Sequence, residues 1–282
     1  MAPLTARELD LYLDLLELDR AGLTMQNLAT LNTIIAAHVD RLPFQAIDTF
    51  AGDLPLMDDD SVFRKVIVQR RGGFCFELNN VLGRLLLTLG FKFHLRGARI
   101  RWGRPLDTPV TPLGHVLLCV DLGDKEGEFF TDVGFGGPNP FKALPIEGDA
   151  DPYRMRKLDG EDYVEVAVKS TGRDGASAHW RPVYHVFSVP QKWIDFVPQY
   201  WYVSLHPQSL FRNILLAGRF TNNSWVTLVN GRLCRRSVSG RVEERRITNA
   251  DEVLRVLESE LMLKLNSDKN LKRLRLRIQS IL

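Results

Sequence analysis

The chain contains the segment Arg70-Arg71-Gly72-Gly73-Phe74-Cys75-Phe76-Glu77-Leu78-Asn79, which leads into apolar residues at helical spacing. The spaced residues are Leu78, Val81, Leu82, Leu85, Leu86 and Leu89. Together they predict one buried helix face, and Gly90 stands where a helix C-cap is typical. Cys75 therefore falls in or just before the first turn of a buried helix.

That position bears on the chemistry of the Cys75 thiol. At a helix N-terminus, unpaired backbone N–H groups and the positive end of the helix dipole favour a thiolate over a thiol. Cys75 is therefore a candidate nucleophile. Free cysteines are also commonly small buried apolar residues, so the placement alone leaves both interpretations open.

Length and composition limit the number of domains and the class of protein. The 282 residues predict one large domain or two to three smaller ones, and 45% apolar with 25% charged residues is ordinary for a soluble globular protein. A net charge of +3 is too small for a nucleic-acid footprint. The three distant cysteines match neither a disulfide framework nor a metal site. We find no signal-peptide pattern and no apolar run near the roughly 20 residues of a membrane span, so we expect a cytoplasmic protein without nucleic-acid or membrane partners.

The hydrophobic period changes along the chain. Helical patterns dominate the first 90 residues, and short strand-like runs with turn signals follow from Phe91. The strand-like runs are 91–102, 115–120, 128–133, 163–168, 184–189, 225–229, 232–238 and 242–247. Such strands favour a barrel or small sandwich over a parallel sheet. A helix is expected from Thr248 to Leu263, and the basic tail 269–282 is either a solvated helix face with inward leucines or a contact for an anionic surface.

A predicted hairpin brings an imidazole and a carboxylate together. The midpoint between His115 and Asp132 lies between Gly123 and Asp124, inside the predicted turn, so an antiparallel register centred there puts both side chains opposite each other on one face. A carboxylate beside an imidazole fixes its tautomer and stabilises its charged form. With Cys75, these residues form a Cys-His-Asp set in chain order.

Each member also has a structural interpretation. A lone strand histidine is commonly structural, and Asp132 can cap the turn before Gly134. No other histidine has so convenient a carboxylate across a tight hairpin; these are His38, His94, His179, His185 and His206. Cys119 lies in an apolar run that suits packing, and Cys234 among arginines is a minor candidate. Geometry alone leaves the triad and the structural interpretation both open.

Three motifs at compatible spacing resemble one family. They are Arg71-Gly72-Gly73-Phe74-Cys75-Phe76-Glu77-Leu78-Asn79, Gly114-His115-Val116-Leu117-Leu118 and Asp132-Val133-Gly134-Phe135-Gly136-Gly137. They resemble the arylamine N-acetyltransferases, especially the bacterial ones, and the resemblance covers nearly the whole chain. Leu42-Pro43-Phe44-Gln45-Ala46-Ile47-Asp48 is similar to the Pro-Phe-Glu-Asn segment of that family.

The resemblance implies an α+β fold with a cysteine-protease/transglutaminase-like core. We expect a helical bundle at 1–92 carrying the nucleophile, an antiparallel β-barrel at 93–195 carrying His115 and Asp132, and an α/β lid at 196–282. It also implies a ping-pong reaction of xenobiotic metabolism. Cys75 would take an acetyl group from acetyl-coenzyme A and pass it to an arylamine, arylhydrazine or N-hydroxyarylamine, with no permanently bound cofactor and no metal.

The resemblance further implies residues around the reacting atoms. Gly134, Phe135 and Gly136 would lie beside the acyl donor, because glycine lets a bound chain approach the backbone closely. The candidate walls for a flat aromatic substrate are Phe44, Phe74, Phe135 and Phe211. The basic residues considered for the donor phosphates are Arg101, Arg104 and Lys142. A monomer or a homodimer is compatible with the sequence.

Two departures from the family pattern carry expectations. Gln45 and Ala46 replace the glutamate and asparagine of Pro-Phe-Glu-Asn, and that glutamate is expected to pair with the arginine that corresponds to Arg71. Gln45 keeps one hydrogen bond but loses a charge-assisted one, so we expect the Arg71 loop to be held less firmly by about 1 kcal/mol. Gly114 replaces a threonine or serine, which opens space near the site.

Other functions are compatible with the same motifs. An amide synthase of antibiotic biosynthesis resembles the same family but closes a macrolactam, and another acyl-coenzyme A, such as propionyl or malonyl, is a possible donor. A cysteine protease would share the triad, but the whole-chain resemblance argues against it. A degenerate family member acting as a binding module is the non-enzymatic alternative.

Overall fold

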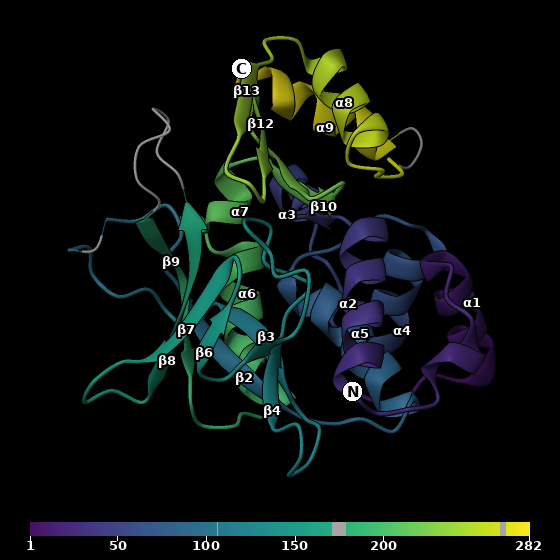
Figure 1. Ribbon diagram of the computed structural model, residues 1–282. Coiled ribbons are helices and arrows are strands. Elements are labelled where there is room, and N and C mark those ends of the chain that lie inside the picture. The colour runs from purple at the N-terminus through teal and green to yellow at the C-terminus, as the bar shows by residue number, and fades with distance from the viewer. Residues whose placement is uncertain (106, 171–178, 266–268) are drawn as a thin grey trace.

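The computed structural model describes residues 1–105, 107–170, 179–265 and 269–282. It is an α+β fold in which helices, a curled antiparallel sheet and a smaller sheet with two helices form three groups (Figure 1). The helices are α1 (Ala6–Leu16), α2 (Leu28–Arg41), α3 (Ile47–Ala51), α4 (Asp59–Phe63), α5 (Cys75–Thr88), α6 (Val197–Leu205), α7 (Leu210–Asn213), α8 (Ala250–Ser259) and α9 (Lys269–Gln279).

The strands belong to two antiparallel sheets. The larger sheet contains β2 (Lys92–Ile100), β3 (His115–Asp121), β4 (Glu128–Thr131), β5 (Leu144–Pro145), β6 (Gly148–Ala150), β7 (Tyr153–Lys157), β8 (Tyr163–Ser170) and β9 (His179–Phe187). The smaller sheet contains β1 (Phe44–Gln45), β10 (Leu216–Thr221), β11 (Ser224–Val229), β12 (Arg232–Ser237) and β13 (Val242–Arg246).

The predicted helix after Cys75 is confirmed as α5, which lies inside the helical group. Every residue from Cys75 to Leu86 is buried, which agrees with the apolar spacing in the sequence. The Glu77 carboxylate accepts a hydrogen bond of 3.1 Å from the Phe74 N–H, so one free donor at the helix start is satisfied. Gly90 follows the helix with φ +84°, a conformation that favours glycine.

The larger sheet has the strand order β5-β4-β3-β2-β9-β8-β7-β6. Its edge strands β5 and β6 contact each other, so the sheet curls into a nearly closed barrel. The helix α5 packs on β3, and this contact joins the helical group to the barrel. The predicted antiparallel barrel is therefore confirmed. The strands β5, β6 and β7 were not predicted from the sequence: β5 and β6 have only two and three residues, and the alternation of β7, with Tyr153 and Met155 buried, was missed.

The smaller sheet has the order β1-β10-β11-β12-β13. Phe44 of β1 pairs with Gly218 of β10, so a short strand from the N-terminal helical part belongs to the smaller, C-terminal sheet. One face of this sheet packs on α8 and α9 through a shared apolar core. In α9, Leu274 and Ile278 are buried while Arg275 is exposed and pairs with Asp251 at 2.6 Å. Of the two interpretations of the basic tail, the structure therefore agrees with a solvated helix face whose apolar residues point inward.

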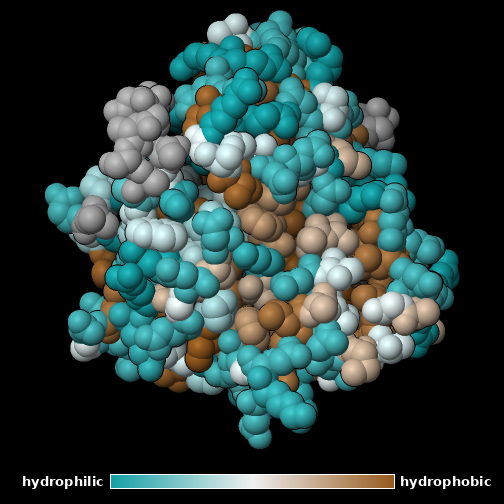
Figure 2. Space-filling model, viewed as in Figure 1, coloured by the Kyte–Doolittle hydropathy of each residue, from teal (hydrophilic) through white to brown (hydrophobic). Residues whose placement is uncertain are grey.

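Polar residues cover most of the face seen in Figure 2, and apolar ones gather near its middle, where the helical group meets the barrel. Within the ranges described above, no helix combines the length and apolar character needed to cross a bilayer.

Candidate active site

Cys75 is the first residue of α5 and is 3% exposed. The loop after β4 lies directly against it, because a Cβ atom added to Gly134 would be 2.7 Å from the Cys75 Cα. Any larger residue at this position would push the loop away from the helix. Glycine at 134 is therefore what allows the loop to approach the start of α5.

His115 and Asp132 form a buried pair. The His115 Nε2 lies 2.7 Å from Asp132 Oδ2, and each residue is 1% exposed. Burial alone would lower the pKa of His115, but the charge and hydrogen bond of Asp132, with a smaller contribution from Cys75, raise it to about 10. Burial likewise opposes the charge on Asp132, yet His115 holds the pKa of that carboxyl below its usual value. The pair therefore favours an imidazolium beside a carboxylate.

Cys75 lies close enough to His115 to contribute to the raised pKa of the imidazole. Since Asp132 occupies Nε2, Nδ1 is the ring nitrogen that remains available for a second partner. The structure thus brings together three residues from the start of a helix, the start of a strand and the end of a hairpin. Such a row can stabilise a thiolate and can deliver or accept a proton at the sulfur.

The hairpin register differs from the sequence-based prediction. Leu118 pairs with Thr131 and Asp121 with Glu128, which places the midpoint of the hairpin between Asp124 and Lys125, one position later than predicted. Asp132 is therefore a diagonal neighbour of His115 and not the residue directly opposite. Diagonal neighbours remain within reach of longer side chains, so the contact forms although the predicted register was wrong.

Asn79 is a site residue that the sequence analysis missed. Its Nδ2 donates to Asp132 Oδ1 at 3.0 Å and to the Val116 carbonyl at 2.8 Å, and its Oδ1 accepts from the Val133 N–H at 3.1 Å. Asn79 is completely buried and stands four residues after Cys75, hence on the same face of α5. That spacing was the available signal. The residue ties the helix to the strand of His115 and to the loop of Asp132.

The four predicted phenylalanines lie around this centre in two places. Phe74 contacts Phe211 with ring centroids 5.6 Å apart, and Phe211 contacts Phe44 at 6.0 Å. Phe135 instead lies edge-on to His115 at 5.5 Å. Of the four, Phe211 lines a cavity of about 580 Å³ that also reaches Gly114, the residue before His115. The glycine expected to open space near the site therefore borders this cavity.

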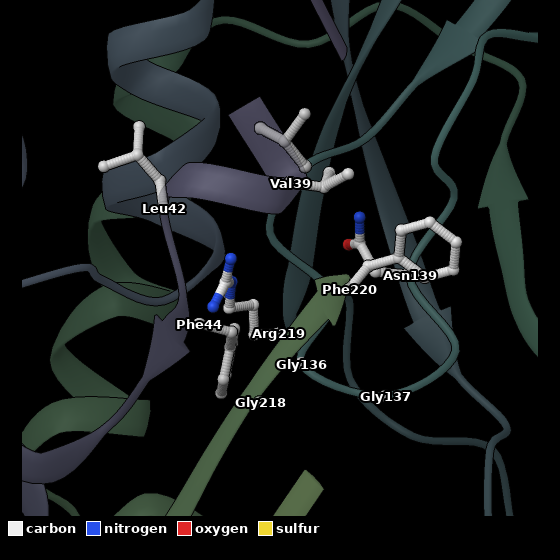
Figure 3. A pocket seen from close by; sticks show the side chains of 10 residues that line it. Val39, Leu42, Phe44, Gly136, Gly137, Asn139, Gly218, Arg219 and Phe220 are labelled. Atoms are coloured by element: carbon white, nitrogen blue, oxygen red, sulfur yellow. The ribbon is translucent and has the colours of Figure 1, made fainter. Parts of the chain in front are cut away.

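The back of the loop 134–137 is well packed. Gly136 has φ +58°, and a Cβ atom there would lie 2.5 Å from the Phe44 ring. Figure 3 shows this side, where a cavity of about 20 Å³ is surrounded by Phe44, Gly136, Gly137, and Gly218 and Arg219 of β10. That volume holds about one water molecule, so this side offers no room for a substrate. A bound acyl donor has to approach the loop from another side.

Comparisons with known proteins place the chain in a family. A sequence model described as N-acetyltransferase matches residues 27–270. An arylamine N-acetyltransferase of Mycolicibacterium smegmatis is 34% identical over 257 residues, which are 88% of this chain and 89% of that protein. The chain belongs to the arylamine N-acetyltransferase family.

Further similarities extend over the same length. The arylamine N-acetyltransferase of Escherichia coli is 27% identical over 256 residues, 89% of this chain and 87% of that protein. The structure of the Mycobacterium marinum arylamine N-acetyltransferase in complex with CoA superimposes with a TM-score of 0.85 at 26% identity, covering 97% of this chain and 99% of that one. The resemblance stated from the motifs is therefore confirmed.

The arylamine N-acetyltransferase pairing expected at Gln45 takes a different form here. Arg71 forms its ion pair with Asp48, while Gln45 Oε1 accepts from the Ile47 N–H at 2.5 Å. Lys65 Nζ lies 2.6 Å from both Asp48 and Glu77, which makes a buried cluster of two cations and two carboxylates. The expectation of a poorly held Arg71 was wrong, because Asp48 supplies the carboxylate three residues further along.

The other candidates of the sequence analysis lie elsewhere. Arg101 is buried and donates to the Pro105 carbonyl at 3.2 Å, Arg104 lines the 580 Å³ cavity, and Lys142 is half-buried before β5. Burial raises the pKa of the Cys119 thiol to about 11 and also raises that of Cys234, so neither environment favours a thiolate.

Proposed function

We propose that this arylamine N-acetyltransferase homologue transfers an acetyl group from acetyl-coenzyme A to an arylamine, arylhydrazine or N-hydroxyarylamine through an acetyl-Cys75 intermediate. The observation that carries the proposal is the buried His115–Asp132 pair, with its 2.7 Å hydrogen bond, beside a cysteine at a helix N-terminus. In this proposal Cys75 is the nucleophile, His115 transfers protons and Asp132 holds the imidazolium.

In the first half-reaction, the Cys75 thiolate attacks the thioester carbonyl carbon and forms a new carbon–sulfur bond. The bond to the coenzyme A sulfur breaks, and the departing thiolate takes a proton from the His115 imidazolium. Negative charge develops on the carbonyl oxygen between these events. The backbone N–H of Phe76, in the first turn of α5, is the proposed donor to that oxygen, since N–H groups there have no partner within the helix.

In the second half-reaction, the acceptor nitrogen attacks the acetyl-Cys75 carbonyl and the sulfur leaves as a thiolate. A weakly basic arylamine is already neutral near pH 7, so it needs a base only when the new bond forms. Acetylation removes the contribution of Cys75 that raises the pKa of His115, although the larger contribution of Asp132 stays. His115 has given its proton to the coenzyme A sulfur, and the lower pKa favours this neutral form, so the ring is free to take the proton that the nitrogen loses.

The 580 Å³ cavity is the proposed acceptor site. Its lining carries aromatic and aliphatic side chains, including Trp102, Tyr202, Val203 and Phe211, and it borders Gly114 next to His115. Its volume lies within the range of about 300–1,000 Å³ that is typical of sites for drug-sized ligands. A flat aromatic amine fits this composition.

The test uses the purified full chain with acetyl-coenzyme A and an arylhydrazine or arylamine. We expect release of free thiol that depends on the acceptor and, without acceptor, a mass increase of one acetyl group on Cys75. Cys119→Ser is the matched control, because Cys119 is a buried free thiol of the barrel that lies outside the proposed site. Retained transfer in Cys75→Ala, or acetylation at another residue, would refute the assignment.

A further inference from the structure

A second cavity, of about 260 Å³, lies between the barrel and the smaller sheet. Its lining includes Trp102, Gly137, Arg181, Trp225, Cys234 and Arg236. Gly137 ends the loop whose Gly134 packs on Cys75, and three extended residues span at most about 10 Å. Trp102 borders both this cavity and the proposed acceptor site. A long ligand whose reactive end lies at Cys75 can therefore extend into the second cavity.

Strand alternation directs a row of polar side chains toward this cavity. Trp225 pairs directly with Arg236, and Thr227 with Cys234, so these residues share one face of the β11–β12 ladder. The intervening residues of the two strands, among them Val226, Leu228 and Leu233, pack in the apolar core with α8. The cavity side of β12 therefore carries Arg232, Cys234 and Arg236.

Two of the cavity arginines lack a counter-charge. Arg232 is paired with Glu244 at 2.5 Å, but within the described ranges neither Arg181 nor Arg236 has a carboxylate within ion-pair distance. Arg181 lies over the Trp102 ring at 4.5 Å, which fixes its guanidinium at the cavity wall. Burial, and next the charge of Arg236, lowers the pKa of Arg181, which indicates that the two cations act on each other across the cavity.

We propose that Arg181 and Arg236 bind phosphate groups of the acyl donor in this cavity. The inference rests on the proposed function, because acetyl-coenzyme A carries its phosphates at the far end of the arm that ends in the thioester. Guanidinium groups form paired, charge-assisted hydrogen bonds with phosphate oxygens, and an anion between two facing cations relieves their repulsion. Neither arginine was among the basic residues considered from the sequence, because only the fold brings β9 and β12 to the same cavity.

The test compares two donors that share the thioester and its arm. Acetyl-coenzyme A carries phosphates, and acetylpantetheine carries none. In Arg181→Ala and Arg236→Ala we expect the KM for acetyl-coenzyme A to rise about tenfold, which corresponds to about 1.4 kcal/mol. The KM for acetylpantetheine should change less than about twofold, and kcat should change little with either donor, because the altered contacts are made equally before and during the reaction.

Arg235→Ala is the matched control, because Arg235 is adjacent on β12, points to the other face and pairs with Glu260. We expect it to leave both KM values unchanged. Arg236→Lys keeps the positive charge and should restore part of the loss. If Arg181→Ala unfolds after losing its contact with Trp102, the half-exposed Arg236 still decides the question.

The outcomes separate the two proposals. An unchanged KM for acetyl-coenzyme A in Arg236→Ala, or an equal rise for both donors, overturns the phosphate site while the acyltransferase proposal stands. A parent protein that is never acetylated by acetyl-coenzyme A overturns the proposed function itself. A rise restricted to the phosphorylated donor supports the phosphate site.

Discussion

We expect the Gln45→Glu substitution to destabilise this protein, whereas the family pattern alone predicts that the substitution is stabilising. The cluster of Asp48, Glu77, Lys65 and Arg71 is already balanced in charge, and Gln45 Nε2 lies 3.5 Å from Asp48 Oδ2. A carboxylate at Gln45 would therefore lie next to the Asp48 carboxylate. Two like charges at that distance repel by about 5 kcal/mol at an effective dielectric constant near 20, and the two cations offset most of this, so we expect a net loss of about 1 kcal/mol.

Asp48→Asn is the complementary change. It removes the carboxylate that serves both Arg71 and the buried Lys65, and breaking a buried ion pair from one side typically costs about 3–5 kcal/mol. Because Glu77 still pairs with Lys65, we expect the low end, about 3 kcal/mol. The double variant Gln45→Glu with Asp48→Asn restores one carboxylate beside the cations, so it should recover at least about half of that loss.

The assay is urea unfolding of the parent, both single variants and the double variant, analysed as a double-mutant cycle. Single-turnover acetylation of Cys75 provides the second measurement, because Glu77 links the cluster to the N–H of Phe74, the residue just before Cys75. A stabilising Gln45→Glu, or a double variant less stable than Asp48→Asn, would refute the reasoning. The first result would also restore the expectation drawn from the sequence.

Three further predictions concern the site and the helical core. Asp132→Asn removes the charge that raises the pKa of His115, so the imidazolium is lost. Alkylation of Cys75 by iodoacetamide at about pH 6 should then slow at least tenfold. Equal alkylation rates in the variant and the parent would contradict the proposed pairing. Gly134→Ala puts a methyl group 2.7 Å from the Cys75 Cα and should cost about 1–3 kcal/mol with a matching loss of acetylation, whereas Gly22→Ala, with nothing within 4 Å, should do neither. His38 is fully buried, and burial lowers its pKa to about 3. The unfolded chain therefore binds the proton of this histidine more tightly than the folded one. The free energy of unfolding should fall as the pH drops below about 6.5, by up to about 1.4 kcal/mol per pH unit. His38→Gln, measured by urea unfolding at three pH values, should flatten that slope, and parallel curves would exclude His38 as its source.

Local patterns in the sequence were sufficient for the elements that hold the candidate site. The apolar spacing after Cys75 predicted α5, and the turn residues after Val120 predicted the hairpin of β3 and β4. Helix period, capping glycine and turn composition depend on residues close together in the chain, so one sequence carries them in full. The three motifs were likewise enough to indicate the family.

The features that the sequence did not predict have a common physical cause. The pairing of Phe44 with Gly218, the choice of Asp48 over Gln45 as the partner of Arg71, and the meeting of Arg181 and Arg236 all depend on contacts between distant segments. Even the midpoint of the hairpin moved by one position, which shifts the strand pairing by two residues, because the geometry of the turn decides the register.

The sequence by itself therefore determined where Cys75 stands on its helix and which residue types accompany it. The tertiary structure decided which charged groups face one another. The physical reason is that periodicity and capping are local properties, whereas an electrostatic interaction depends on the distance between two charges and on their burial, and both are set only when the chain has packed.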